Sequence, residues 1–356
     1  MTIKNTKLIW IVLLIEVALV QFISQFTNWV EEVYSSNLFL KIAHFERLVF
    51  GKLPFSMGDL VYVILILYII GLLWKGLKNQ DNSVNQGFYQ LLKLIGVVYF
   101  LFYFLWGLNY YRKPLFEKMN IDNTYSNADL LLFTEKLIDE TNQIQFNIAR
   151  SKTFKITNPY SENQLISISI IGYDNLNKKN ACFEYKTPSI KPSLFSFLLS
   201  YMGFSGYLNP FTNEAQFNSK VPKYGFPMTI CHEMAHQIGF ASESECHFIG
   251  YLACLNSKNL YHRYAANILA LKYCFQALAI NNNDFAKQEY QKLNLGIIEN
   301  LKEDKAFYKQ YHTFIDSGFE MFYDRFLKLN QQKDGMEGYS KFLNLLINYQ
   351  KQVSEN

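Results

Sequence analysis

Charged residues are scarce in this chain. Asp, Glu, Lys and Arg make up 18% of its 356 residues, whereas half of the residues are hydrophobic and 17% are aromatic. This composition is apolar for a soluble protein and favours a chain with membrane segments. The formal net charge of +4 is small, and no basic stripe or nucleic-acid-binding motif accompanies it, so we expect no nucleic-acid partner.

Cysteine is also rare, and its pattern does not fit a disulfide framework. The chain has five cysteines, which is an odd number. Four of them lie in apolar stretches predicted to be helical, where a cysteine is a small buried side chain. They therefore indicate no particular cellular compartment. The five are Cys182, Cys231, Cys246, Cys254 and Cys274.

Three apolar runs near the start of the chain are close to the length that crosses a bilayer. They cover about residues 8–26, 57–74 and 94–111. The third run ends in Trp106, Tyr110 and Tyr111, an aromatic cluster typical of a membrane interface. Residues 38–50 form an amphipathic stretch that either lies on the membrane surface or packs on the C-terminal domain. We expect residues 1–111 to form three transmembrane helices, with the lipid bilayer as a partner.

The first run has a second interpretation as a signal peptide, because Lys4 and Lys7 precede its apolar part. Its length and its lack of a small-x-small cleavage site favour an uncleaved anchor. Glu16 lies inside this run, and an acidic residue in a bilayer is costly and usually has a partner. Glu16 either has a functional role or lies on the polar face of a tilted helix.

Positive charges predict the orientation in the membrane. Lys4 and Lys7 flank the first run and Lys75 and Lys78 follow the second, which places both regions in the cytoplasm if positive residues stay inside. The loop after the first run and the segment after the third carry nearly as many positive residues. Because three spans put the two chain ends on opposite sides, we expect a cytoplasmic N-terminus and an extracytoplasmic C-terminal domain.

His232, Glu233 and His236 form the motif HExxH. Histidines four residues apart lie on one face of an α-helix, so both can bind one zinc ion. Glu233 can take a proton from a water molecule at the metal without being a ligand itself. With only six histidines in the chain, the motif arises by accident in roughly one such chain in two hundred. Pro227 and Gly239 also suit the two ends of a short helix, so we interpret the motif as a zinc site with Glu233 as catalytic base.

A catalytic zinc site usually has three protein ligands, and Glu243 and Glu245 are the nearest candidates for the third. Ser242 and Glu245 have the spacing of a capping box, which leaves Glu245 less free to bind metal. Many glutamate-ligated zincins carry the third ligand at the start of a Glu-x-x-Ala-Asp segment, and Glu243 starts the corresponding segment here. We therefore expect His232, His236 and Glu243 as ligands, with Glu245 as the alternative.

His247 stands where that segment has its polar residue. It either orients a ligand from outside the coordination sphere or binds the metal itself. Gly239 also fits the longer pattern HExxHxxGxxH, but Ser242 stands where that pattern has its third histidine. The longer pattern therefore fails.

Beyond a predicted linker at residues 112–126, residues 127–356 have the pattern of an α+β domain. Helices are expected at 128–149 and 192–202, and strands at 164–171, 181–185 and 211–218. Residues 260–352 are expected to be mostly helical, with breaks near 281–283 and 334–338. A few strands before an HExxH helix, with helices after it, is the order expected of a zincin-like domain with a small sheet.

The segment at 211–218 is also a candidate for substrate binding. An edge strand beside the active helix holds an extended peptide by backbone hydrogen bonds. Asn213, Glu214 and Gln216 are the candidate substrate-binding residues of this segment. An ordinary structural strand is the alternative interpretation.

Four blocks of sequence resemble, in matching order, a family of bacterial multi-pass membrane proteins catalogued as a domain of unknown function. They are Pro54–Leu60, Trp106–Arg112, Ser205–Thr212 and Cys231–Cys254. The resemblance implies three spans, a large C-terminal domain and a zinc metallopeptidase activity, but no substrate. The family has alanine and asparagine where this chain has Cys246 and His247, so the surroundings of the ligands differ.

These features predict a membrane-anchored zinc metallopeptidase that hydrolyses peptide bonds in a peptide or protein substrate. In this hypothesis Glu233 activates water at a zinc ion. The residues Tyr207, Tyr251, His262 and Tyr264 lie near the motif, but no spacing selects one of them to stabilise the oxyanion. The alternative is a non-catalytic membrane protein in which a zinc-stabilised zincin-like domain serves binding or sensing.

Overall fold

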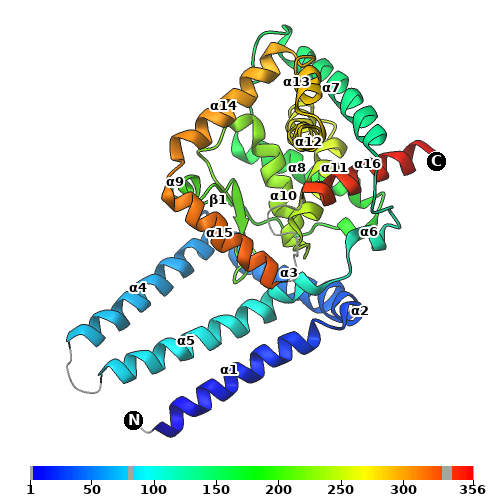
Figure 1. Ribbon diagram of the computed structural model, residues 1–356. Helices are drawn as coiled ribbons and strands as arrows, with labels where there is room; N and C mark the ends of the chain where they lie inside the picture. Colours follow the sequence, from blue (N-terminus) through cyan, green and yellow to red (C-terminus); the bar gives the residue numbers. More distant parts are fainter. Residues whose placement is uncertain (1–2, 79–82, 331–338, 356) are drawn as a thin grey trace.

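Apolar helices and a helical domain occupy opposite ends of the molecule (Figure 1). The structure is a computed structural model that describes residues 3–78, 83–330 and 339–355. Within these residues the chain is mostly helical and contains one small sheet. The fold is therefore α+β, as the sequence predicts.

The N-terminal part supplies the helices that are apolar enough to cross a membrane. Its described elements are α1 (Ile3–Ile23), α2 (Thr27–Trp29), the π-helix η1 (Val30–Leu38), α3 (Phe39–Phe50), α4 (Met57–Lys78) and α5 (Ser83–Leu105). By length and composition, α4 can span over Met57–Lys75 and α5 over Gln86–Leu105. A third span results if Lys7–Ile23 and Thr27–Phe50, which meet at 92°, count as one broken span. The described part of the chain thus has two or three candidate spans.

The structure corrects the ends of two predicted spans. The first apolar run stops at Ile23 instead of residue 26, because the chain turns where the Ser24 hydroxyl donates back to the Gln21 carbonyl. The third span ends at Leu105 instead of residue 111. The aromatic cluster that follows is buried against the C-terminal domain and does not form the predicted membrane-interface belt.

The C-terminal domain follows directly. Its described elements are η2 (Gly107–Tyr111), α6 (Leu115–Lys118), α7 (Asn127–Ala149), α8 (Glu162–Asn177), η3 (Ala181–Phe183), β1 (Ile190–Pro192), α9 (Ser196–Tyr201), β2 (Gly206–Leu208), β3 (Ala215–Phe217), η4 (Lys223–Gly225), α10 (Phe226–Gln237), α11 (Glu243–Asn256), α12 (Leu260–Asn281), α13 (Asn283–Tyr290), α14 (Leu295–Tyr311), α15 (Phe314–Leu329) and α16 (Tyr339–Glu355). The apolar core of the domain is centred on α10, α11 and α12. The HExxH helix α10 therefore lies in the middle of the domain.

The strand predicted at 164–171 is wrong, because this segment belongs to α8. Ser161 starts the helix with a capping box, in which its side chain and that of the residue three positions later each accept a backbone N–H. Leu165, Ser169 and Tyr173 are buried at a spacing of four, which is the period of a helix face. The alternation of isoleucine and serine imitated a strand, but capping and burial select the helix.

The sheet differs from the prediction in its order. The described strands run in the order β1-β3-β2, with β1 parallel and β2 antiparallel to β3. Of the strand predicted at 211–218, only Ala215–Phe217 form a strand, β3, and it is the central strand and not an edge. The segment at 181–185 contains the short 3₁₀ helix η3 in place of a strand. The helix predicted at 192–202 begins only at Ser196, because Pro192 still belongs to β1.

The predicted linker at residues 112–126 is packed against the domain. Leu115 and Ile121 are buried in its core, and Leu115 starts the short helix α6. The segment therefore joins the two parts of the chain firmly and is no free spacer.

The predicted helical region from residue 260 onward is confirmed in the described residues, where it forms α12 to α16. The break predicted near 281–283 is confirmed at Asn282, whose side chain caps α13. The break predicted at 334–338 lies outside the described residues.

Helix α3 packs on the C-terminal domain, which is one of its two predicted positions. Phe39, Ala43 and Arg47 are buried on one side of it. Arg47 Nη1 donates to the carbonyl oxygen of Gln237 at 2.7 Å and to Asn213 Oδ1 at 2.8 Å. Because Gln237 ends α10, its carbonyl has no partner within that helix, and Arg47 supplies the missing donor.

Two further donors reach the same end of α10. Trp106 Nε1 donates to the carbonyl oxygen of His236 at 3.3 Å, and Arg112 Nη1 donates to that of Gly239 at 2.7 Å. Arg112 also makes two 2.9 Å bonds to the carboxylate of Glu31. Cationic donors at the C-terminus of a helix stabilise the carbonyl groups that have no partner within the helix, and they interact favourably with the helix dipole. Segments next to the candidate spans therefore hold the end of the HExxH helix.

Replacing Arg47 tests this anchor. We expect Arg47→Met to lower the free energy of unfolding by about 2–4 kcal/mol, because two buried acceptors lose their donor. Thermal unfolding of the protein in detergent measures the effect. Lys41→Met on the exposed side of the same helix is the matched control, and an equal loss in both variants would contradict the anchoring role of Arg47.

Candidate metal centre

The motif helix α10 is short and almost entirely buried. Pro227 occupies its first turn, where a missing N–H costs nothing. Gly239 follows its end with φ +86°, a conformation that glycine adopts without strain. A side chain at Gly239 would also collide with Phe39 at 2.8 Å. The helix therefore ends where the sequence predicts, and α3 packs directly against that end.

The structure brings His232, His236 and Glu243 together. Their ligand atoms lie within 4.8 Å of one another, and they form the candidate metal-binding group among the described residues. His232 Nε2 lies 3.1 Å from one carboxylate oxygen of Glu243, and His236 Nε2 lies 3.8 Å from the other. Glu243 stands in the first turn of α11, which packs against α10. The predicted ligand set is thus assembled in space.

This group fits a zinc ion in donor type and spacing. Two imidazoles and one carboxylate are a known catalytic zinc set. Ligand bonds of about 2.1 Å in a tetrahedral site put neighbouring donor atoms roughly 3.4 Å apart, close to the two distances above. Burial acts to raise the pKa of Glu243, but hydrogen bonds and charge from His232 and His236 hold it well below its ordinary value. The carboxylate is therefore in the ionised form that a metal requires.

His236 is held in the orientation that a ligand needs. Its Nδ1 donates to the carbonyl oxygen of Phe240 at 2.8 Å, which turns Nε2 towards Glu243. The Cys246 thiol lies 3.2 Å from the same Nδ1. Burial raises the pKa of Cys246 to about 11, although His236 acts against this. Cys246 is therefore a neutral neighbour of the ligand, and the prediction of small buried cysteines is confirmed for it.

Glu233 lies beside the ligand group without belonging to it. Its Oε2 is buried and has no hydrogen-bond partner among the described residues. Burial raises its pKa to about 8, while the charge of His236 lowers it and that of Glu243 raises it. The backbone of β2 passes close by, since a Cβ at Gly206 would stand 2.8 Å from Glu233 Oε1. A carboxyl group with a pKa near neutrality can accept and return a proton.

Glu245 and His247 do not join the ligand group. Glu245 Oε1 accepts from the backbone N–H of Leu115 at 2.6 Å, and Ser242 makes no side-chain cap. The predicted capping box is therefore wrong, although Glu245 is engaged elsewhere as expected. The ring of His247 packs 4.4 Å from that of His232, and burial lowers its pKa to about 3. His247 thus supports a ligand by contact as a neutral imidazole.

The predicted substrate residues Asn213, Glu214 and Gln216 are fully buried on or beside the central strand. Glu214 accepts from Lys191 Nζ at 2.6 Å and from the backbone N–H of Gly58 at 2.5 Å. Gln216 donates to Ser56 Oγ, and Asn213 accepts from Arg47. These side chains hold the start of α4 and the end of α3. A central strand has no free edge for a peptide, so the expectation of substrate binding there is corrected.

Tyr323 of α15 is a site residue that sequence reasoning missed. Its hydroxyl donates to Glu243 Oε1 at 2.6 Å. Burial and the charge of Glu243 raise its pKa well above the ordinary value, so the hydroxyl keeps its proton. Phe319, Tyr323 and Phe326 recur at helical spacing and face the site. The spacing of these aromatic residues was visible in the sequence. Nothing in the spacing, however, indicated a contact with Glu243, which lies 80 residues earlier.

The four other residues considered near the motif serve different purposes. Tyr207 bonds to Asp59 at the start of α4, and Tyr264 donates to Asn300. His262 lies against Ser169, and the hydroxyl of Tyr251 is buried without a partner in the described residues. Of these, Tyr207 lines the cavity at the metal centre.

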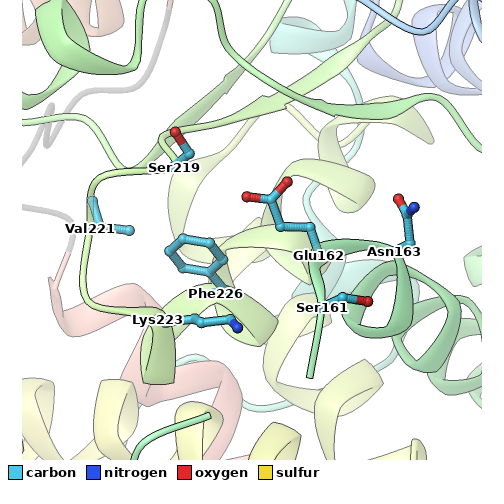
Figure 2. Close-up of a pocket in the computed structure, with 7 residues that line it drawn as sticks. All are labelled: Ser161, Glu162, Asn163, Ser219, Val221, Lys223 and Phe226. Carbon is cyan, nitrogen blue, oxygen red and sulfur yellow. The ribbon is translucent and has the colours of Figure 1, made fainter. Parts of the chain in front are cut away.

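A cavity of about 1030 Å³ opens onto the candidate metal centre. His232, Glu233, His236 and Glu243 line one part of its wall, and aromatic or aliphatic side chains line most of the rest. A large apolar cavity with a few convergent polar groups is typical of a ligand-binding site. Figure 2 shows a second cavity of about 530 Å³, around Ser161, Glu162 and Phe226. It lies at the N-terminal end of α10, away from the ligand residues.

A family model described as "Protein of unknown function (DUF3810)" matches residues 34–347. The match covers most of the chain, and the chain belongs to this family. No curated protein and no solved structure matches it. The resemblance noted in the sequence is thus confirmed for the family, which by its description assigns no activity.

Metal content tests the ligand set. We expect purified protein to hold about one zinc ion per chain, and His236→Ala and Glu243→Gln to lose it. Loss of a residue that only supports a ligand lowers the metal affinity by typically 10–100-fold, and loss of a ligand itself lowers it by more. Elemental mass spectrometry of protein in detergent gives the ratio. Glu245→Gln is the matched control and retains the metal. Zinc retained by Glu243→Gln but lost by Glu245→Gln would reverse the assignment.

The pKa of Glu233 predicts a pH-dependent stability in metal-free protein. Its folded value of about 8 lies above its ordinary value of 4.5, so ionisation of the buried carboxyl opposes folding. The penalty is absent below pH 4.5 and grows as the pH rises towards 8. In the presence of a chelator, Glu233→Gln should therefore melt at a higher temperature than the wild type, and the difference should grow as the pH rises over this range. Glu184→Gln, at an exposed carboxylate, controls for loss of charge, and a pH-independent difference for Glu233→Gln would refute the assignment.

Proposed function

We propose that this family member is a membrane-anchored zinc metallopeptidase that hydrolyses amide bonds. The observation that carries the proposal is the convergence of three suitable ligands and an unpartnered buried carboxyl group on one apolar cavity. The two or three apolar helices support a membrane location. We further propose that the C-terminal domain has a zincin-like design.

His232, His236 and Glu243 would hold the zinc ion. Zinc supplies Lewis acidity, which polarises the substrate carbonyl and lowers the pKa of water. The hydrogen bond from His236 to Phe240 and the packing of His247 on His232 keep both imidazoles in place. The protein thereby fixes the geometry before a substrate arrives.

Glu233 acts as the general base and then as the acid. It takes a proton from the attacking water as the new C–O bond forms at the carbonyl carbon. It then gives a proton to the amide nitrogen as the C–N bond breaks, so that a carboxylic acid and an amine leave. General acid–base catalysis of this kind contributes typically 10²–10⁴-fold. The raised pKa of Glu233 suits both directions of transfer.

Tyr323 is the proposed donor to the developing oxyanion. Its hydroxyl stands 2.6 Å from a carboxylate oxygen of Glu243 and keeps its proton at neutral pH. Tyr323 lines the same cavity as Glu233 and Glu243, so its hydroxyl would be available as a donor there if Glu243 held a metal. A preorganised donor in a cavity that excludes water stabilises such a charge strongly.

The edge strand β2 is the proposed peptide-binding strand. It pairs with β3 on one side only in the described sheet. Gly206 brings its backbone against Glu233, and β2 lines the cavity. An extended peptide can add to a free edge by backbone hydrogen bonds, which would place its amide groups next to the general base.

The proposed orientation has the N-terminus in the cytoplasm and the C-terminal domain outside. The N-terminal end of α1 and the far ends of α4 and α5 point away from the domain (Figure 1). Lys7 and Lys75 lie towards these far ends, and positive residues are retained on the cytoplasmic side.

Glu233→Gln separates catalysis from metal binding. We expect the variant to keep its zinc and to lose at least about 100-fold in hydrolysis, because the proton acceptor is gone. Incubation of protein in lipid nanodiscs with a mixed peptide library, followed by mass spectrometry of cleaved bonds, measures the activity. Glu184→Gln serves as the exposed control.

The competing function is a metal-stabilised binding or sensing module. The buried Oε2 of Glu233, which has no hydrogen-bond partner among the described residues, argues against this function. A buried carboxyl group without a partner is unfavourable, and a protein without catalytic activity has no need of it. Cells that carry Glu233→Gln and behave like the wild type, while a deletion does not, would favour that competitor.

A further inference from the structure

The cavity at the metal centre extends down to the membrane helices. Its wall includes Tyr62, Leu65 and Ile66 of α4 and Phe102 of α5. All four lie inside the candidate spans Met57–Lys75 and Gln86–Leu105. Leu65 is eight residues into its span, which corresponds to roughly 12 Å along a helix axis. One cavity therefore reaches from bilayer depth to the ligand residues.

The metal centre itself lies close to the membrane boundary. Trp106 directly follows the end of the α5 span, and its indole donates to the His236 carbonyl. The rings of Trp106 and His236 are 6.1 Å apart. The first residue beyond the span thus touches a ligand residue.

Helices α4 and α5 both contribute to the wall of this cavity. The two helices run side by side from their far ends up to the domain (Figure 1). Their lining residues face the cavity between these helices and the domain. The cavity is therefore bounded on one side by the two helices that are long and apolar enough to cross a membrane.

Helix α15 covers the cavity from the domain side. Phe319, Tyr323 and Phe326 line the cavity, whereas Met321 and Phe322 of the same helix are exposed. Apolar residues exposed beside candidate spans are typical of a helix that lies at the bilayer surface. The cavity is thus bounded by elements that suit contact with lipid.

We propose that the substrate is a peptide that carries a hydrocarbon acyl chain and enters from the bilayer between α4 and α5. The acyl chain lies along Leu65, Ile66 and Phe102, and the amide bond next to it reaches the metal centre. This inference rests on the proposed function and names its substrate class.

Apolar continuity explains why such a substrate suits this site. Lifting an acyl chain out of a bilayer into water is unfavourable by roughly fourfold in the partition constant for each methylene. A chain that slides from lipid into an apolar cavity avoids this loss. The head of the substrate therefore reaches the ligand residues while its chain remains in apolar surroundings.

The size of the cavity favours an acyl chain over a transmembrane helix. A helix of 20 residues is about 30 Å long and 10 Å wide, which exceeds about 2000 Å³, whereas the cavity holds about 1030 Å³. A helical substrate would have to unwind within the bilayer, where freed backbone groups lose their hydrogen bonds. A flexible chain needs no such rearrangement.

Two hydroxamate probes test the proposal, because a hydroxamate binds zinc in place of the scissile group. The probes are N-palmitoyl-glycine hydroxamate and N-acetyl-glycine hydroxamate, titrated into zinc-loaded protein in phosphatidylcholine nanodiscs. Leu65→Trp fills the lower cavity, and Ile66→Phe is a milder second variant. Leu67→Trp, on the same helix with 62% of its side chain exposed and outside the lining, is the matched control. Zinc content and melting temperature confirm that each variant is folded.

We expect Leu65→Trp to lower the affinity for the palmitoyl probe at least fivefold. Its affinity for the acetyl probe should stay within twofold of that of the wild type. Leu67→Trp should leave both probes within twofold, which removes simple partitioning into lipid as an explanation. If the acetyl probe binds but neither cavity variant changes the palmitoyl affinity, the acyl-chain proposal is overturned while the zinc enzyme stands. Failure of the wild type to bind zinc or the acetyl probe would overturn the proposed function instead. A hydroxamate attached to a transmembrane helical peptide that binds more tightly than the palmitoyl probe would overturn the substrate class.

Discussion

The C-terminal end of helix α10 is the constraint on which the rest of the structure depends. A helix that ends inside a protein leaves carbonyl groups that must find donors. Here the carbonyls of His236, Gln237 and Gly239 accept from Trp106, Arg47 and Arg112. All three donors come from the segments around the candidate spans. The HExxH helix is thus fixed by the membrane-proximal part of the chain and not by its own domain alone.

This arrangement determines where the candidate site lies. Because Trp106 directly follows the candidate α5 span, a helix held by Trp106 must end beside that span. His236 is in the last turn of that helix, so the ligand group shares this position. The same closeness lets side chains of both spanning helices line the cavity that contains Glu233. Site, cavity and membrane helices are therefore parts of one packing arrangement.

The sheet is joined to the membrane helices by a second set of polar contacts. Glu214, next to β3, accepts from the backbone N–H groups of Met57 and Gly58 at the start of α4, and Lys191 of β1 neutralises it. Carboxylates stabilise the N-terminus of a helix, where backbone donors are free. Tyr207 of the edge strand bonds to Asp59 of the same helix. The edge strand, Glu233 and the wall formed by α4 are thereby held in one relative position.

The sequence alone determined the features that depend on local spacing. Residues four apart on a helix share a face, so HExxH indicated two histidines and an adjacent carboxylate before any contact was known. Long apolar runs likewise indicated the spans. The sequence favoured Glu243 over Glu245 on two grounds, the segment that Glu243 begins and a capping box between Ser242 and Glu245. The structure contradicts the capping box, because Ser242 makes no cap and Glu245 bonds to the backbone N–H of Leu115. Only tertiary structure decided the bond between Glu245 and Leu115 and the proximity of Tyr323 to Glu243. It also decided the place of β3 at the centre of the sheet and the end of the third span at Leu105. Each of these depends on partners far apart in the chain, and no local periodicity encodes which distant groups satisfy one another.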